Sequence, residues 1–148
     1  MKMIILVFAF LIGGMSQAQI LDPVKWSTSV NKISETEYEL IAIADIEKEW
    51  HLYSQRVPED GPIPTSFVYA GNGNYLKKGN TLEGKGHVIQ DPVFEMEIKY
   101  FENKAEFRQR IKLKGEVPFK IEAIVEFMVC DDSRCLPPTE KELVFDIN

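Results

Sequence analysis

The sequence predicts an all-β protein, an antiparallel sandwich of about eight or nine short strands, and three observations support this. Apolar and polar residues alternate with a period of two along much of the chain, as in strands that bury one face. Glycine, proline and asparagine gather between the alternating stretches, at Pro58–Pro64 and Gly71–Asn74, and indicate loops. Beyond the N-terminal segment, no long stretch keeps a helical period. Short strands at this spacing are typical of two packed antiparallel sheets.

The N-terminal segment predicts a cleavable signal peptide. Lys2 gives a positive start, an apolar run covers Ile4–Ile12, and small and polar residues lead to Ala18, after which we expect cleavage. The apolar run is far shorter than the roughly 20 residues that span a bilayer as a helix. We therefore expect removal of residues 1–18 and one exported domain at residues 19–148, with no membrane span in the mature chain.

Two neighbouring stretches carry the strongest strand pattern. In Lys104–Lys114, charged residues alternate with mainly apolar ones, and Phe119–Val129 repeats the alternation. The turn residues Gly115 and Pro118 between the two stretches predict a hairpin. The expected strands, in order, are Val24–Ile33, Glu37–Ile46, Trp50–Tyr53, Ser66–Tyr69, Tyr75–Leu82, Glu97–Phe101, Lys104–Lys114, Phe119–Val129 and Glu142–Ile147.

The charge of the chain limits the classes of partner. The full sequence carries a net charge of −6 at pH 7, and removal of Lys2 with the signal makes the mature domain more acidic still. An acidic surface disfavours nucleic acid and anionic membranes, because their phosphates repel carboxylates. We expect neither as a partner. Nothing in the sequence indicates an obligate oligomer, so we expect a monomer.

The residues most informative about function are the two cysteines. Cys130 ends a strongly alternating stretch, four polar residues follow, and Cys135 comes just before the double proline Pro137–Pro138. If the polar residues form a loop, the Cα atoms can approach within the roughly 4.4–6.8 Å that a disulfide requires. A bridge that closes so short a loop adds only roughly 2 kcal/mol of stability. Cysteines in a polar loop are open to attack by another protein's thiolate, so redox exchange and a structural bridge are both compatible with the pattern.

Neighbouring charges distinguish the two thiols. Arg134 lies next to Cys135 in sequence and favours its thiolate, whereas Asp131 and Asp132 follow Cys130 and disfavour that thiolate. From these charges we expect Cys135 to be the attacking thiol and Cys130 to be the resolving thiol.

The segment from Val125 to Thr139, with both cysteines and the double proline, resembles the N-terminal periplasmic domain of the DsbD family of thiol:disulfide interchange proteins. The resemblance extends upstream and covers nearly all of the expected mature chain. The other matching segments are Pro23–Trp26, Trp50–Ser54, Gly61–Phe67 and Asp91–Met96.

This resemblance implies an immunoglobulin-like fold in the periplasm, with the cysteine pair at one end. It implies a protein-disulfide reductase module that takes electrons from a thioredoxin-like domain or a membrane electron transporter. The acceptor would be a periplasmic disulfide isomerase or another oxidoreductase. No metal or organic cofactor is expected, since the sulfurs carry the two electrons. In the family the more C-terminal cysteine attacks, which agrees with the choice of Cys135.

The resemblance also implies a cap loop that shields the cysteine pair until a partner docks. The matching loop is Asp91–Glu95, with Phe94 as the shielding aromatic residue. Phe94 also shares a period-two face with Ile98 and Tyr100, so an ordinary core position is the alternative.

The same match places the strand Trp50–Tyr53 beside the cysteine pair, with His51 and Tyr53 on the face opposite Trp50 and Leu52. There Tyr53 can pack on the disulfide and His51 can tune it, while surface or packing roles are the alternative. A zinc site that combines the cysteines with the two histidines is not expected, because this spacing fits no common zinc pattern.

Two features depart from the family's pattern. Family members place five residues between their cysteines, where this chain has four. Full-length members continue into a membrane segment and a thioredoxin-like domain, which are not in this sequence, so we expect the electron donor to be a separate polypeptide. The competing hypothesis is a non-catalytic immunoglobulin-like binding module whose short disulfide only holds a recognition loop.

Overall fold

The computed structural model describes residues 20–148, so the predicted signal peptide lies outside the described part. Residues 20–148 form eleven strands and no α-helix, and hence contain no helix long and apolar enough to cross a membrane. The strands are β1 (Val24–Lys32), β2 (Glu37–Ile46), β3 (His51–Tyr53), β4 (Ser66–Tyr69), β5 (Tyr75–Glu83), β6 (His87–Gln90), β7 (Glu97–Phe101), β8 (Lys104–Leu113), β9 (Phe119–Phe127), β10 (Val129–Cys130) and β11 (Thr139–Ile147).

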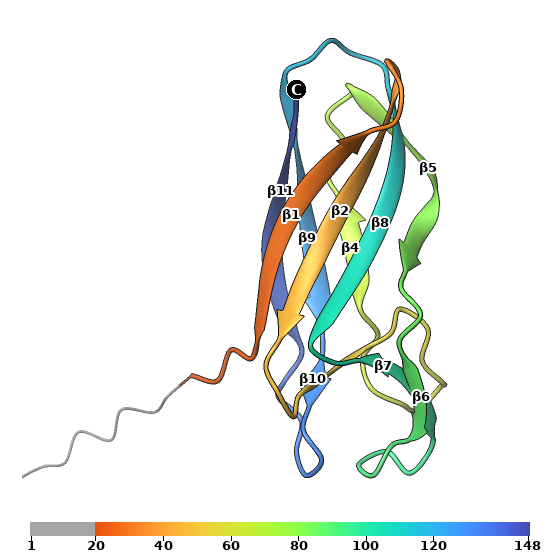
Figure 1. Ribbon diagram of the computed structural model, residues 1–148, viewed down its shortest axis with the longest axis vertical. Helices are drawn as coiled ribbons and strands as arrows, with labels where there is room; N and C mark the ends of the chain where they lie inside the picture. Colours follow the sequence, from red (N-terminus) through yellow and green to blue (C-terminus); the bar gives the residue numbers. More distant parts are fainter. Residues whose placement is uncertain (1–19) are drawn as a thin grey trace, which may run out of the picture.

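Hydrogen bonds arrange these strands of residues 20–148 in three antiparallel sheets. The orders are β1-β2-β8-β5, β11-β9-β4 and β10-β3-β7-β6. The first two sheets face each other and form the body of the sandwich, while the third lies at one end of it (Figure 1). The predicted all-β antiparallel sandwich is confirmed, with a third small sheet added at the end that carries the cysteines.

The main core lies between the first two sheets, where the inward-facing side chains of both sheets meet. Phe107 of β8, Ile121 of β9 and Phe145 of β11 are buried there. Trp26 of β1 lies against the same core, with its ring 5.4 Å from that of Phe127. Burial of apolar area at about 25 cal/mol per Å² is the main stabilising contribution in such a core. The period-two pattern therefore identified the buried face as well as the strands.

The predicted hairpin between the stretches of β8 and β9 is wrong. β8 pairs with β2 and β5, whereas β9 pairs with β11 and β4, so the two strands belong to different sheets. The connection between them, Lys114–Pro118, crosses the sandwich. Its Lys114 N–H donates a 2.7 Å hydrogen bond to the carbonyl of Asn74, in the loop before β5. A period-two pattern shows that a strand buries one face, but it does not identify the neighbouring strand.

The predicted strand Phe119–Val129 is divided in the structure. β9 ends at Phe127, and β10 pairs with β3 in the third sheet, with Cys130 opposite His51. The chain thus changes sheets at Met128. This change places Cys130 at the end of the sandwich instead of in its central core.

Two further differences from the prediction concern strands β6 and β11. β6 was not predicted, because it is an edge strand whose residues are mostly exposed and show no hydrophobic alternation. β11 begins at Thr139, where the sequence predicted a start at Glu142. Thr139 lies opposite Phe127 at the end of β9, so β9 and β11 are paired along their full length up to the cysteine loop.

Gln109 is a fully buried polar residue on the inward face of β8. The register between β5 and β8 shifts between Lys78 and Leu82, where the pairing of the two strands is irregular. The side-chain amide of Gln109 donates to the carbonyl of Gly79 over 3.2 Å, and its oxygen accepts from the Thr81 hydroxyl over 2.9 Å. The side chain of Gln109 therefore binds the irregular part of β5, where a bulge interrupts the ladder.

Candidate active site

Cys130 and Cys135 form a disulfide across a short loop at the end of the sandwich. Their Cα atoms lie 4.0 Å apart, and the two residues form an isolated antiparallel bridge. Cys130 is only 1% exposed, because β10 lies within the third sheet, whereas Cys135 is half-buried. Of the two sulfur-bearing residues, Cys135 is therefore the one that solvent and another protein can reach.

The loop between the cysteines is organised by the side chain of Asp131. Its carboxylate accepts hydrogen bonds from the backbone N–H of Ser133 over 2.9 Å and of Arg134 over 2.8 Å. These bonds, the one from the Ser133 backbone N–H first, lower the pKa of Asp131 to about 2. Beyond the loop, the Leu136 N–H donates to the carbonyl of Val129 over 2.9 Å and closes the turn.

Arg134 has two partners in the structure. Its Nε atom lies 3.3 Å from the carboxylate of Asp131, and its guanidinium lies 5.8 Å from the ring centroid of Trp50. The sequence placed this positive charge next to Cys135. The structure shows that the same charge is paired with Asp131, so its effect on the Cys135 thiolate is shared with a neighbouring carboxylate.

β3 supplies the floor of the site. Tyr53 is fully buried in a small apolar cluster with Cys130, Ile98 and Tyr100. Trp50 and Leu52 lie instead in the main core, on the face opposite Tyr53, as the alternation predicted. Both faces of the strand are buried, which the alternation did not predict.

The ring of His51 lies beside the cluster that surrounds Cys130. It stacks on the ring of Tyr100 with centroids 4.2 Å apart, and its Nε2 atom lies 3.2 Å from Glu102. His87 approaches the same carboxylate, at 4.0 Å. The sequence reasoning missed Glu102. This residue is far from His51 in sequence, and strand β7 separates it from His87. Within residues 20–148, no cluster of histidine, cysteine and acidic residues is arranged to hold a metal ion.

The predicted cap segment, Asp91–Glu95, forms a tight turn between β6 and β7. The Asp91 carboxylate accepts hydrogen bonds from the backbone N–H of Val93 over 2.8 Å and of Phe94 over 3.0 Å. Phe94 is half-buried and packs on the same cluster as Cys135, with its ring edge-on to Tyr53 at 6.0 Å. The turn therefore holds Phe94 ahead of β7 and over the cluster that contains both cysteines.

A buried hydrogen bond joins the predicted cap segment to β3. The hydroxyl of Tyr53 donates to the carboxylate of Asp91 over 2.8 Å, and Asp91 is only 2% exposed. Burial and the neighbouring Asp91 both raise the pKa of Tyr53, so its hydroxyl keeps the proton that it donates.

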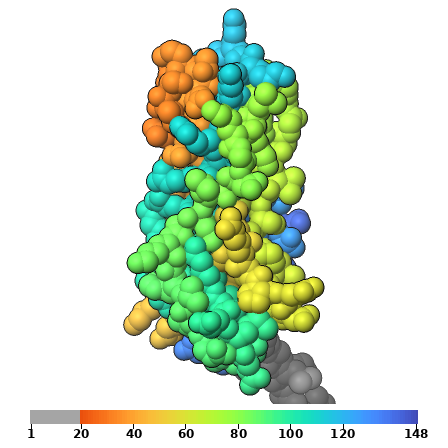
Figure 2. Space-filling model, turned by 90° about the vertical axis from the view of Figure 1, so that its right-hand side faces the viewer, coloured from red at the N-terminus to blue at the C-terminus, as the bar shows by residue number. Residues whose placement is uncertain are grey.

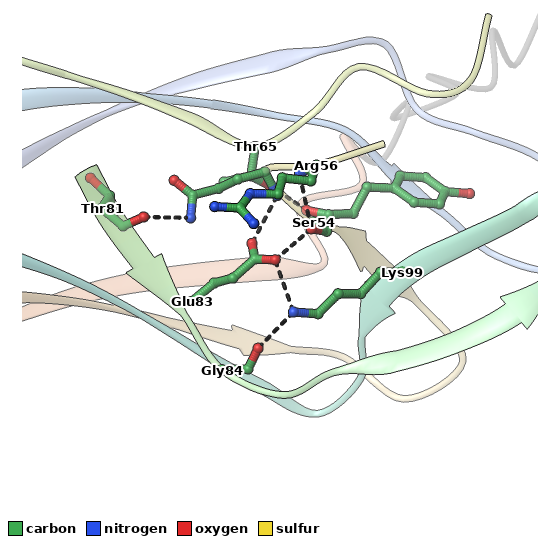
Figure 3. A network of polar contacts seen from close by, with 9 residues as sticks. Ser54, Arg56, Thr65, Thr81, Glu83, Gly84 and Lys99 are labelled. Carbon is green, nitrogen blue, oxygen red and sulfur yellow. Dashed lines mark hydrogen bonds and ion pairs between the residues drawn. The ribbon is translucent and has the colours of Figure 1, made fainter. Parts of the chain in front are cut away.

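A polar network behind β3 was also missed by sequence reasoning. Glu83, at the end of β5, accepts hydrogen bonds from Ser54 and Gln55, the two residues that follow β3, and forms an ion pair with Lys99 of β7 (Figure 3). The only sequence signal was the match of Ser54 to the family pattern, since residues so distant along the chain are not paired by any local pattern.

Comparison with known proteins identifies the family. The family model described as "Thiol:disulfide interchange protein DsbD, N-terminal" matches residues 17–147 of the chain. The chain belongs to this family. As a DsbD N-terminal domain it is a module of thiol–disulfide exchange, and the predicted membership is confirmed. No sequence among the curated proteins matches the chain.

Solved structures give similarities of fold at low sequence identity. The N-terminal periplasmic domain of ScsB from Proteus mirabilis matches with a TM-score of 0.56 and 13% identity, over 83% of this chain and 45% of that chain. The reduced DsbD N-terminal domain of Neisseria meningitidis matches with a TM-score of 0.48 and 15% identity, over 82% and 83% of the two chains. The yeast GGA1 GAE domain matches with a TM-score of 0.47 and 9% identity, over 88% and 96%. The predicted immunoglobulin-like β-sandwich of a DsbD N-terminal domain is thereby confirmed.

Proposed function

We propose that this domain carries electrons between proteins of the periplasm through the Cys130–Cys135 pair. The observation that carries the proposal is the unequal exposure of a cysteine pair in a loop at the end of the sandwich. Cys130 is buried beneath the loop, whereas Cys135 is accessible at its side. Such a pair suits a two-step exchange in which an outer sulfur attacks and an inner sulfur resolves.

The exchange begins with the domain reduced. The thiolate of Cys135 attacks one sulfur of the partner's disulfide, so a mixed disulfide forms and the partner's other sulfur leaves as a thiolate. The thiolate of Cys130 then attacks the sulfur of Cys135, which releases the partner as a dithiol. The domain becomes the disulfide seen here, and the partner gains two electrons and two protons. The sulfurs carry both electrons, so the proposal requires no metal or organic cofactor.

The cap shields the pair between partners. Phe94 and the Asp91 turn lie over the cluster that contains both cysteines, and a docking partner would displace them to reach Cys135. This arrangement limits side reactions with small thiols and oxidants while it leaves exchange with a docked protein possible.

The proposed donor is a thioredoxin-like domain or a membrane electron transporter. The proposed acceptor is a periplasmic disulfide isomerase or a related oxidoreductase, and the domain acts on it as a monomeric protein-disulfide reductase. The similar ScsB domain of Proteus mirabilis is periplasmic, which supports this location, as does the signal-like order of the first residues.

The first test is the reduction potential of the pair in the purified mature domain, measured against glutathione buffers. We expect a value within the range of exchange proteins, roughly −270 to −120 mV. A value well below about −300 mV would support the competing hypothesis, a binding module with a structural disulfide.

The second test assigns the roles of the two thiols. The variant Cys130→Ala is expected to accumulate a mixed disulfide with the physiological partner, because Cys135 can attack but nothing resolves the product. The matched variant Cys135→Ala is expected to lose exchange altogether. Equal loss of trapping in both variants, or full exchange by Cys135→Ala, would contradict the assignment.

A further inference from the structure

We infer that Glu83 is a positioning residue for the redox pair: it holds the end of β3 so that Tyr53 stays under the cap. The inference rests on the proposed function, because it concerns the shielding of the same cysteines. Glu83 lies in the sheet β1-β2-β8-β5 and is distant from the cysteines in sequence, yet through β3 it affects how readily they react.

The carboxylate of Glu83 is bound on both oxygens by the two residues that follow Tyr53. The Ser54 hydroxyl donates to one oxygen over 2.5 Å, and the Gln55 backbone N–H donates to the other over 2.8 Å (Figure 3). A bidentate anchor of this kind fixes the direction of the backbone as well as its position. Figure 2 shows the corresponding face, where the segment after β3 (yellow) lies beside β5 (green).

Lys99 of β7 completes the anchor. Its ammonium group donates to Glu83 over 2.9 Å and to the carbonyl of Gly84 over 2.8 Å, and the side chain of Glu83 is only 11% exposed. Burial alone raises the pKa of Glu83, but the hydrogen bonds from Ser54 and Gln55 and the contact with Lys99 outweigh it and lower the pKa. The carboxylate is therefore ionised, and its hydrogen bonds to the chain are charge-assisted.

The anchor continues directly into the floor of the active site. The Ser54 backbone N–H donates to the carbonyl of Lys99 over 3.1 Å, and the carbonyl of Tyr53 accepts a 2.6 Å bond from the Thr65 hydroxyl. Tyr53 in turn donates its hydroxyl to Asp91 of the cap. On its other side β3 pairs with the short strand of Cys130, which offers only two residues of ladder. The contacts of Glu83 thus add to the bonds from Thr65 and to the pairing of Tyr53 with Tyr100 of β7, which together fix the C-terminal end of β3.

The test measures how fast dithiothreitol reduces the disulfide in the oxidised domain, well below the melting temperature. Glu83→Gln is expected to raise the second-order rate constant by about fivefold, which corresponds to about 1 kcal/mol of barrier. The matched control is Glu39→Gln. Glu39 is similarly buried, at 17% exposure of its side chain, and pairs with Arg108 over 2.8 Å. This pair joins β2 and β8 in the sheet β1-β2-β8-β5. This control is expected to lower stability comparably and to leave the rate unchanged.

A double-mutant cycle separates positioning from general loosening of the fold. If Glu83 acts through Tyr53, then Glu83→Gln adds nothing to the rate increase caused by Tyr53→Phe. Additive rate effects, or an equal rate increase in the Glu39→Gln control, would overturn the inference.

Ser54→Ala provides a second variant that removes one donor and leaves the buried charges paired. It should reproduce part of the rate increase even if Glu83→Gln fails to fold. An unchanged rate in Ser54→Ala would also overturn the inference. These outcomes are independent of the proposed function, which is tested by the reduction potential of the unaltered domain.

Discussion

The hydroxyl of Tyr53 and the carboxylate of Asp91 form a 2.8 Å hydrogen bond that joins the floor of the active site to its cap. Both side chains are buried, with exposures of 0% and 2%. The two residues come from β3 and from the turn before β7, so this bond connects two parts of the chain that meet only through the fold. If the predicted cap shields the cysteines as proposed, we expect docking of a partner to break or rearrange this contact.

Tyr53→Phe tests this contact. The variant leaves the ring in place but removes a donor from a buried carboxylate, so we expect the free energy of unfolding to fall by about 1–3 kcal/mol. We also expect faster reduction of the disulfide by dithiothreitol, because the cap is held less firmly. Tyr38→Phe is the control, since the Tyr38 hydroxyl donates to the Asn148 carbonyl over 3.2 Å, away from the cysteines. A rate increase of the same size in both variants would argue against a specific role for Tyr53.

Phe94→Ala tests whether the cap shields the pair. We expect the reduced domain to react about tenfold faster with iodoacetamide at Cys135, which corresponds to about 1.4 kcal/mol of barrier. Phe119→Ala is the control, because Phe119 is also a half-buried aromatic residue but packs on the main core. If Phe94 has only a core role, its removal will lower the melting temperature and leave the alkylation rate unchanged.

The lowered pKa of Asp131 predicts that the cysteine loop is sensitive to acid. Its pKa is about 2 in the folded protein against an ordinary value of 3.8, so the carboxylate stabilises the loop fully above the ordinary value. This contribution is lost as the pH falls below 3.8 and through about 2. In NMR titrations, the amides of Ser133 and Arg134 should therefore shift with a midpoint well below 3.8. Asp131→Asn should abolish the titration and keep the turn, whereas a midpoint at or above 3.8 would contradict these contacts.

Gln109→Leu tests the buried amide in β8. Although leucine is apolar and of similar size, the change leaves the carbonyl of Gly79 and the hydroxyl of Thr81 without their partner. Gly79 is exposed and Thr81 is half-buried, so water can replace part of what the amide supplied, and we expect a loss of about 1 kcal/mol. Ile111→Leu on the same inward face is the control, with an expected cost below about 1.5 kcal/mol. Chemical denaturation of the two variants decides the matter, and a stabilised Gln109→Leu would show that the bulge is satisfied in another way.

Those parts of the fold that follow from local periodicity could be predicted from the sequence. Alternation in β8 and β9 identified both strands and their buried faces, because half-burial imposes the same period wherever the strand pairs. The pairing itself was not local information. The connection Lys114–Pro118 resembles a hairpin turn in composition, yet it crosses between sheets.

The functional site likewise has a part that local sequence shows and a part that only the fold brings together. The cysteine loop lies within a few residues of sequence, so its chemistry was visible from Cys130, Cys135 and the polar residues between them. The contacts of Glu83 with the chain after β3 join residues 28 and 29 positions apart, and the bond from Tyr53 to Asp91 spans 38. Only the arrangement of the three sheets brings such residues together.

The closure of the cysteine loop on itself also bears on how such domains diversify. The Asp131 carboxylate binds backbone N–H groups inside the turn, and the Leu136 N–H closes the turn onto the Val129 carbonyl. The register of β9 with β11 is fixed outside the loop, where Phe127 and Thr139 are the last pair before it. An inserted or deleted codon in the loop would therefore alter the geometry of the thiols without disturbing the sandwich. Evolution can adjust the reactivity of the pair by changing the length of one turn, with the rest of the gene under separate selection for folding.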